Sequence, residues 1–212
     1  HPLASTAIEV IEGGRKVAGS ATFQADLVEL QDVASQAVVE TLALRKGQRI
    51  LDYCAGGGGK ALALAALADS AVDAWDSDAA RMQDIAKRAE RAGADITCLT
   101  EKPSGQYDIV LCDVPCSGSG AWRRAPQGKW LLTSERLTQL GNVQGDILQQ
   151  AARLVSPGGV LVYTTCSLLA QENMDQLAKF TEATPGWICD FSRQFLPFEG
   201  GDGFFAGHLK SV

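Results

Sequence analysis

The sequence predicts an α/β fold in which a mostly parallel, doubly wound sheet is completed by a C-terminal antiparallel hairpin. Short apolar runs alternate with segments of helical composition between residues 48 and 165, as expected for a parallel sheet with crossover helices. Two strand-like runs near the C-terminus, 187–191 and 202–209, have only turn-rich sequence between them, which indicates a hairpin. The 212 residues, 46% hydrophobic and 21% charged, suffice for one globular domain and exclude a disordered or fibrous chain.

The elements of the parallel part follow from apolar runs and from their flanking residues. The predicted strands are residues 48–54, 71–76, 95–99, 107–112 and 159–165. The predicted helices are residues 60–68, 78–92 and 134–155. Asp78 can cap the second helix and Gly93 follows its last turn, whereas the turn SPGG precedes the last parallel strand.

The first 44 residues read as a lead-in, with a helix in 31–44 that begins near Ser35, and residues 45–212 read as a catalytic domain. The first residue is not Met, which suggests a fragment of a longer protein. The chain has neither a secretory signal nor an apolar run of 18 residues, so a soluble, cytoplasmic and monomeric protein without membrane contact is expected.

The charge and cysteine counts narrow the function. An excess of 25 acidic over 19 basic residues gives a net charge of −6, which argues against bulk electrostatic attraction to nucleic acid. Six cysteines are too sparse for a disulfide scaffold, and no pair of CxxC motifs is present, so no metal site is expected. Any special cysteine is therefore expected to be chemical rather than structural.

A glycine turn follows the first predicted strand and indicates a bound cofactor. Gly56, Gly58 and Ala61 fit the pattern G-x-G-x-x-A, and Asp76 lies 18 residues after Gly58 at the end of the second strand. A carboxylate at that place can accept the hydroxyls of an adenosine ribose. Nicotinamide cofactors and S-adenosylmethionine both carry that ribose, so this loop leaves the two open.

Two cysteines follow neighbouring strands at the edge where ligands bind in an open α/β sheet. The fourth strand ends in DVPCSGSG, which carries Asp113 and Cys116, and the fifth ends in YTTCS, which carries Cys166. The remaining cysteines read as small hydrophobic residues: Cys54, Cys98, Cys112 and Cys189.

Two thiols, a carboxylate and an adenosine-bearing cofactor suit the methylation of a pyrimidine. Carbon 5 of the ring becomes nucleophilic once a thiolate adds at carbon 6, and a nearby aspartate can stabilise the N3/N4 edge.

Residues 121–136, which we call the basic loop, carry a net charge of +3 and leave −9 on the rest of the chain. Arg123, Arg124 and Lys129 alternate with Trp122 and Trp130, a combination that holds unpaired nucleotides. The alternative is a solvated loop with core tryptophans. The RNA interpretation is favoured by the adjacent cysteine, because a target base must be flipped or single-stranded to reach a thiol.

The residues closely resemble the RsmB/Fmu/Sun (NOL1/NOP2-type) RNA cytosine-5 methyltransferases. The matching stretches cover nearly the whole chain: QDVASQ (31–36), LDYCAGGGGK (51–60), DVPCSGSGAWRRAPQGKW (113–130), TTCSLLAQEN (164–173) and DGFFAGHLK (202–210). The resemblance implies a Rossmann-like class I methyltransferase fold, S-adenosylmethionine as cofactor, and RNA, most plausibly ribosomal RNA, as substrate.

The resemblance also implies residue roles. Cys166 would be the nucleophile, Cys116 would assist release of the methylated base, and Asp113 would hold the cytosine edge. The cofactor would contact Cys54, Ala55, Gly56, Gly57, Gly58, Gly59, Lys60, Asp76, Glu101 and Asp113. RNA contacts are expected from Trp122, Arg123, Arg124 and Lys129. In DNA cytosine-5 methyltransferases the PC cysteine is the nucleophile, so an exchange of the two thiol roles is the alternative.

Two departures from the family pattern stand out. The usual CAAPGGK turn reads CAGGGGK here, and loss of the proline predicts weaker cofactor affinity. The N-terminal RNA-binding region of the family is not in this chain, so firm RNA binding is expected to need it. Methylation of tRNA, a non-catalytic cofactor-binding module and a dehydrogenase are the competing functions; the dehydrogenase leaves both cysteine motifs unexplained.

Overall fold

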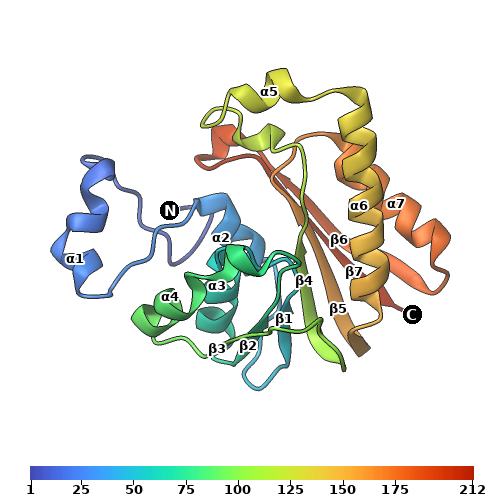
Figure 1. Ribbon diagram of the computed structural model, residues 1–212, viewed down its shortest axis with the longest axis horizontal. Helices are drawn as coiled ribbons and strands as arrows, with labels where there is room; N and C mark the ends of the chain where they lie inside the picture. The colour runs from blue at the N-terminus through green and yellow to red at the C-terminus, as the bar shows by residue number, and fades with distance from the viewer.

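A seven-stranded sheet organises the computed structural model, which describes residues 1–212 (Figure 1). Its strand order is β3-β2-β1-β4-β5-β7-β6. The strands are β1 Ile50–Asp52, β2 Val72–Ala74, β3 Ile96–Cys98, β4 Tyr107–Asp113, β5 Val155–Thr165, β6 Trp187–Phe195 and β7 Phe204–Ser211. Strands β1 to β5 pair in parallel, whereas β7 is antiparallel to both β5 and β6. The predicted fold class, including the C-terminal hairpin, is confirmed.

Helices cover both faces of the sheet (Figure 1). They are α1 Ala21–Gln24, α2 Val33–Glu40, α3 Gly59–Ala68, α4 Ile85–Ala92, α5 Gln127–Leu131, α6 Ser134–Ala152 and α7 Met174–Ala183. Leu51 and Val110 face α6 and α7, while their strand neighbours Ile50 and Leu111 face α2, α3 and α4. Because successive strand residues point to opposite faces, the continuous apolar runs of the sequence fill two cores. None of the helices is long and apolar enough to cross a membrane.

Several element boundaries differ from the prediction. The SPGG segment lies within β5 and not before it, and the β4–β5 register shifts there between Tyr107 and Ile109. Helix α2 begins at Val33 with Asp32 as its N-cap, two residues before Ser35. The predicted helix 78–92 is a 3-10 turn capped by Asp78 followed by α4, which ends at Gly93 as expected.

Helix α7 is absent from the prediction, although it packs under the sheet. Its buried residues are Gln176, Leu177 and Phe180. The segment directly follows the second cysteine motif. Most of its residues are polar, so its few apolar residues did not form a pattern that predicted a helix.

The N-terminal stretch lies beside the body of the molecule, with α1 set apart from the sheet (Figure 1). Ala4 and Ala7 pack with α2 and β7 in a small third core. Arg91 of α4 holds the segment from the other side, because its guanidinium donates to the carbonyls of Phe23 and Val28 and lies 3.8 Å from the Phe23 ring centroid.

Candidate functional site

The glycine turn joins β1 to α3 and is fastened to the end of β2. Gly56 has a φ of +50°, and its N–H donates to the Asp76 carboxylate over 2.9 Å. Asp76 is buried and also accepts from the backbone of Asp78 and from Arg81. Asp76 thus shapes the turn, and a ribose would have to share its oxygens with these donors.

Part of the glycine run serves packing and not ligand approach. A side chain at Gly58, whose φ is +79°, would come within 2.8 Å of Ile85 on α4. At Gly57 the nearest neighbour is only the flexible end of Arg88, at 3.5 Å. The run therefore has two roles: Gly58 lets α4 pack against the turn, and Gly57 leaves it open.

Lys60 connects the glycine turn with the end of β4. Its ammonium is buried, lies 2.7 Å from Oδ2 of Asp113 and sits 4.8 Å from the centre of the Phe204 ring. The sequence predicted that Lys60 contacts the cofactor and that Asp113 contacts both the cofactor and the target base. The ion pair joins these two residues, so the position of one depends on the other.

Asp52, at the end of β1, is a site residue that the sequence analysis missed. It is 1% exposed, and neither carboxylate oxygen has a hydrogen-bond partner. Burial raises its pKa to about 7, against the lowering effect of Lys60. The available signal was an acid at the last position of an otherwise apolar strand.

The two cysteine loops meet, because β4 and β5 are adjacent and Asp113 pairs with Thr164 in their register. We call residues 113–120 the PC loop and residues 164–173 the TCS loop. The Sγ atoms of Cys116 and Cys166 are 3.4 Å apart, and the N–H of Gly120 donates to the carbonyl of Cys166. The structure thus brings together the two thiols that the sequence singled out.

The two thiols differ in their tendency to ionise. The hydrogen bond with Cys166, burial and the charge of Glu172 raise the pKa of Cys116. The same hydrogen bond lowers the pKa of Cys166, with further help from Lys60, while burial and Asp113 oppose it. The favoured arrangement is therefore a thiolate on Cys166 that accepts a hydrogen bond from the S–H of Cys116.

The basic loop is more tightly tied than its sequence suggests. Arg124 forms a two-pronged ion pair with Asp202, whose carboxylate is 1% exposed, and Arg123 lies 3.7 Å from the same group. The backbone N–H of Asp202 donates in turn to Asp32. Arg124 is accordingly an anchor of the loop, and much of its charge is already neutralised.

The two tryptophans of this loop point differently. The indole nitrogen of Trp122 is buried without a hydrogen-bond partner, whereas Trp130 is 80% exposed. The Lys129 ammonium lies 5.5 Å from the Trp130 ring centroid. Trp130 is therefore the tryptophan whose ring is free to stack on a base, whereas the sequence predicted this contact for Trp122.

Glu101 is exposed after β3, and its side chain makes no hydrogen bond or ion pair. Cys112 is fully buried, while Cys54, Cys98 and Cys189 are partly buried against the two cores.

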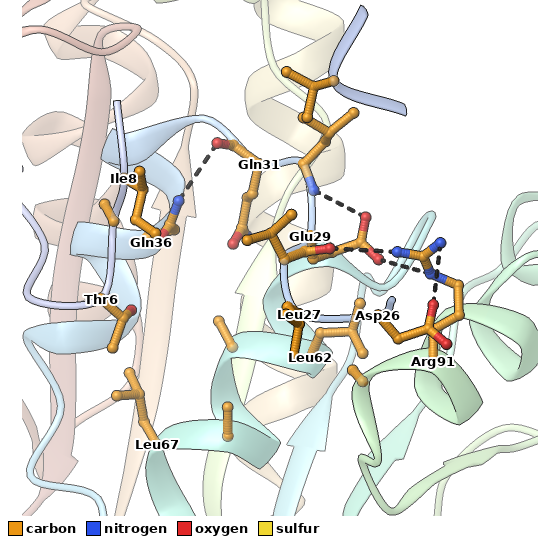
Figure 2. A pocket seen from close by; sticks show the side chains of 18 of the residues that line it. Thr6, Ile8, Asp26, Leu27, Glu29, Gln31, Gln36, Leu62, Leu67 and Arg91 are labelled. Atoms are coloured by element: carbon orange, nitrogen blue, oxygen red, sulfur yellow. Dashed lines mark hydrogen bonds and ion pairs between the residues drawn. The ribbon is translucent and has the colours of Figure 1, made fainter. Parts of the chain in front are cut away.

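A separate cavity of about 600 Å³ lies between the N-terminal stretch and α3 (Figure 2). Leu27 and Leu62 face it, and Arg91 pairs with Asp26 and Glu29 at its rim. Neither cysteine loop lines this cavity, so it does not belong to the thiol site.

Comparison with known proteins gives consistent results. The family model described as 16S rRNA methyltransferase RsmB/F matches residues 39–210. The chain is 36% identical over 193 residues to the ribosomal RNA small subunit methyltransferase B of Proteus mirabilis, with 86% of this chain and 46% of that protein covered. For the protein of the same name from Xylella fastidiosa the values are 38% over 208 residues, with 88% and 49% covered.

Solved structures share the fold. The crystal structure of PH0851 superposes with a TM-score of 0.84 at 27% identity and covers 91% of this chain and 49% of that one. NSun6 from Pyrococcus horikoshii, solved with SFG, gives a TM-score of 0.83 at 21% identity, with 92% and 56% covered. This chain spans about half the length of the curated relatives it matches.

Proposed function

This chain belongs to the 16S rRNA methyltransferase RsmB/F family, and from that premise we propose that it methylates carbon 5 of a cytosine in RNA with S-adenosylmethionine. The observation that carries the proposal is the contact of Cys116 and Cys166 beside the Lys60–Asp113 ion pair. Ribosomal RNA is the proposed substrate, since the curated relatives bear that name. A tRNA substrate is the second candidate, because it would need the same thiols and the same cofactor.

The residues of the glycine turn fit S-adenosylmethionine. Asp52 is a buried carboxylate without a partner, which suits a cationic ligand group such as the ammonium of the methionine part. The glycine turn and Asp76 would hold the adenosine part. Arg81, which is exposed and pairs with Asp76, could move aside so that Asp76 accepts from the ribose hydroxyls. When bound, S-adenosylmethionine supplies an electrophilic methyl group.

In the proposed reaction, the thiolate of Cys166 forms a bond to carbon 6, and the electron pair of the C5–C6 double bond makes carbon 5 nucleophilic. Carbon 5 would then bond to the methyl group as the methyl–sulfur bond of the cofactor breaks, with S-adenosylhomocysteine as the leaving group. The proton on carbon 5 then passes to water, its electron pair restores the double bond, and the sulfur of Cys166 leaves as a thiolate.

Asp113 and Cys116 each have a role in the proposed reaction. Asp113, held by Lys60 at 2.7 Å, would accept from the N4 amino group and orient the ring. Cys116, with its sulfur 3.4 Å from that of Cys166, would donate a hydrogen bond to the departing thiolate. The lowered pKa of Cys166 supports this assignment over the exchanged one.

Covalent trapping tests the proposal. With S-adenosylmethionine and RNA containing 5-fluorocytosine, the wild type is expected to form a stable protein–RNA adduct, because fluorine cannot leave as the proton does. Cys166→Ala should form none. Cys116→Ala should accumulate adducts even with ordinary RNA, because release loses its hydrogen-bond donor. Denaturing gel electrophoresis and peptide mass spectrometry would identify the bonded residue.

The opposite pattern, with adducts lost in Cys116→Ala and kept in Cys166→Ala, would reverse the two roles. Tryptophan fluorescence separates the other functions: binding of NAD but not of S-adenosylhomocysteine would overturn the methyltransferase proposal. Bisulfite sequencing of RNA from cells with and without the gene would distinguish ribosomal from transfer RNA.

A further inference from the structure

Glu172 lies buried between the two cysteine loops. It is 0% exposed, and its carboxylate accepts four hydrogen bonds. Oε1 accepts from the backbone N–H of Ser117 at 2.8 Å and from the Gln144 amide at 3.1 Å. Oε2 accepts from the hydroxyls of Ser117 at 2.5 Å and Ser167 at 2.6 Å.

The network joins the residues that directly follow each cysteine. Ser117 follows Cys116 and Ser167 follows Cys166, so one carboxylate ties the PC loop to the TCS loop. Gln144 of α6 extends the link, because its amide also donates to the carbonyl of Pro115 at 3.0 Å. Glu172 is thus one of the groups that connect the backbone segments carrying the two sulfur atoms.

No cation balances this carboxylate. Its partners are two hydroxyls, a backbone N–H and a side-chain amide, and none of the ion pairs of the molecule includes Glu172. Burying a carboxylate among neutral donors is costly, and apolar packing could join two loops at lower cost. The negative charge of Glu172 is therefore expected to have a function beyond joining the two loops.

The charges around the two thiols are unequal. Glu172 bonds to the residue beside Cys116, because it accepts from the backbone N–H and the hydroxyl of Ser117, and its charge raises the pKa of Cys116. The Tyr163 hydroxyl donates to the backbone carbonyl of Glu172. For Cys166, whose sulfur contacts that of Cys116, the charge of Lys60 lowers the pKa and the charge of Asp113 raises it. The charge of Glu172 disfavours a second anion on Cys116, whereas at Cys166 the positive charge of Lys60 opposes the effect of Asp113.

We propose that Glu172 is a positioning residue that holds the two cysteine loops together and keeps Cys116 in its thiol form, so that Cys166 is the thiol that loses its proton. The mechanistic use of this asymmetry rests on the proposed function, but the asymmetry itself can be measured without RNA or cofactor.

Alkylation of each cysteine by iodoacetamide, followed by peptide mass spectrometry from pH 6 to 10, tests the proposal. In the wild type, Cys166 should react faster than Cys116. Glu172→Gln should raise the rate at Cys116 relative to Cys166, since loss of the negative charge favours the Cys116 thiolate, which is the reactive form. Glu199→Gln, the same change outside the network, should leave the ratio unaltered. An unchanged ratio in Glu172→Gln, or an equal rise at both thiols, would overturn the proposal.

A second measurement leaves Glu172 in place and does not depend on whether Glu172→Gln folds. In Cys166→Ala, Cys116 has lost its sulfur partner but keeps its burial and the charge of Glu172, which both raise its pKa, so its alkylation should keep a midpoint above the ordinary cysteine range. An ordinary midpoint would refute the proposal. Loss of trapping with intact alkylation asymmetry would count against the methyltransferase function alone.

Discussion

A single carboxyl group, that of Asp52, is expected to make the stability of the chain depend on pH. Its burial without hydrogen-bond partners raises its pKa to about 7 in the folded chain. In the unfolded chain the group titrates near its ordinary value of about 4. Between these two values the folded chain holds a proton that the unfolded chain has lost, so the free energy of unfolding falls as pH rises through this window.

Asp52→Asn should remove that dependence. Without cofactor, the variant is expected to be more stable than the wild type above pH 7, by on the order of 1–4 kcal/mol, because the amide carries no buried charge. The difference should shrink as pH falls from 7 to about 4. Urea denaturation at several pH values measures it, and a difference that stays constant with pH would contradict the assigned pKa.

At the scale of elements, the β1–α3 turn combines rigid and open positions. Gly58 cannot carry a side chain without moving Ile85, whereas a Cβ at Gly57 would make only an ordinary contact, at 3.5 Å, with the flexible end of Arg88. Gly57 has no positive φ, and its N–H donates no backbone hydrogen bond. The turn can therefore accept the proline that the family pattern usually has there.

Gly57→Pro is expected to tighten the binding of S-adenosylhomocysteine by about two- to fivefold. The proline removes conformations that binding must otherwise freeze, an effect of about 0.4–1 kcal/mol. Isothermal titration calorimetry measures the affinity. Gly58→Ala is the matched control, which should weaken binding and stability together. An unchanged or weaker affinity in Gly57→Pro would show that the turn is already rigid.

The loop boundaries explain which elements the sequence could predict. Strands β1, β2, β4 and β5 contain apolar runs that end at turns, so the sequence could predict them. The SPGG turn signal was misleading, because β5 carries those residues through a register shift beside β4. Pairing with a neighbouring strand overrode local turn preference there.

At the scale of the whole molecule, the net charge of −6 is unevenly spread. The basic loop contributes its positive charge next to the thiols, but Asp202 already engages Arg123 and Arg124. Lys129 and Arg136 have no ion-pair partner. Stacking on Trp130 is therefore expected to contribute more to RNA contact than bulk attraction does.

Trp130→Ala should weaken the binding of a short single-stranded cytosine-containing RNA by about 1–3 kcal/mol, the usual value of one stacked base. The slope of log K against log salt should stay at about −1.4, because only two phosphates meet unpaired cations of the basic loop and each contributes about −0.7 for a single strand. Fluorescence anisotropy at several salt concentrations measures both. A steep slope, or loss of slope on removing Trp130, would show that charge dominates.

The sequence by itself determined the fold class, the glycine turn, and the pair of cysteines at neighbouring strand ends. These features follow from local patterns and from the rule that parallel strands present their carboxyl ends at one edge. Only the tertiary structure decided how charge is distributed: that Glu172 bonds to the serines beside the two thiols, that Lys60 pairs with Asp113, and that Asp202 pairs with Arg124. Burial and partners set the ionisation of a side chain, and segments distant in the chain supply both.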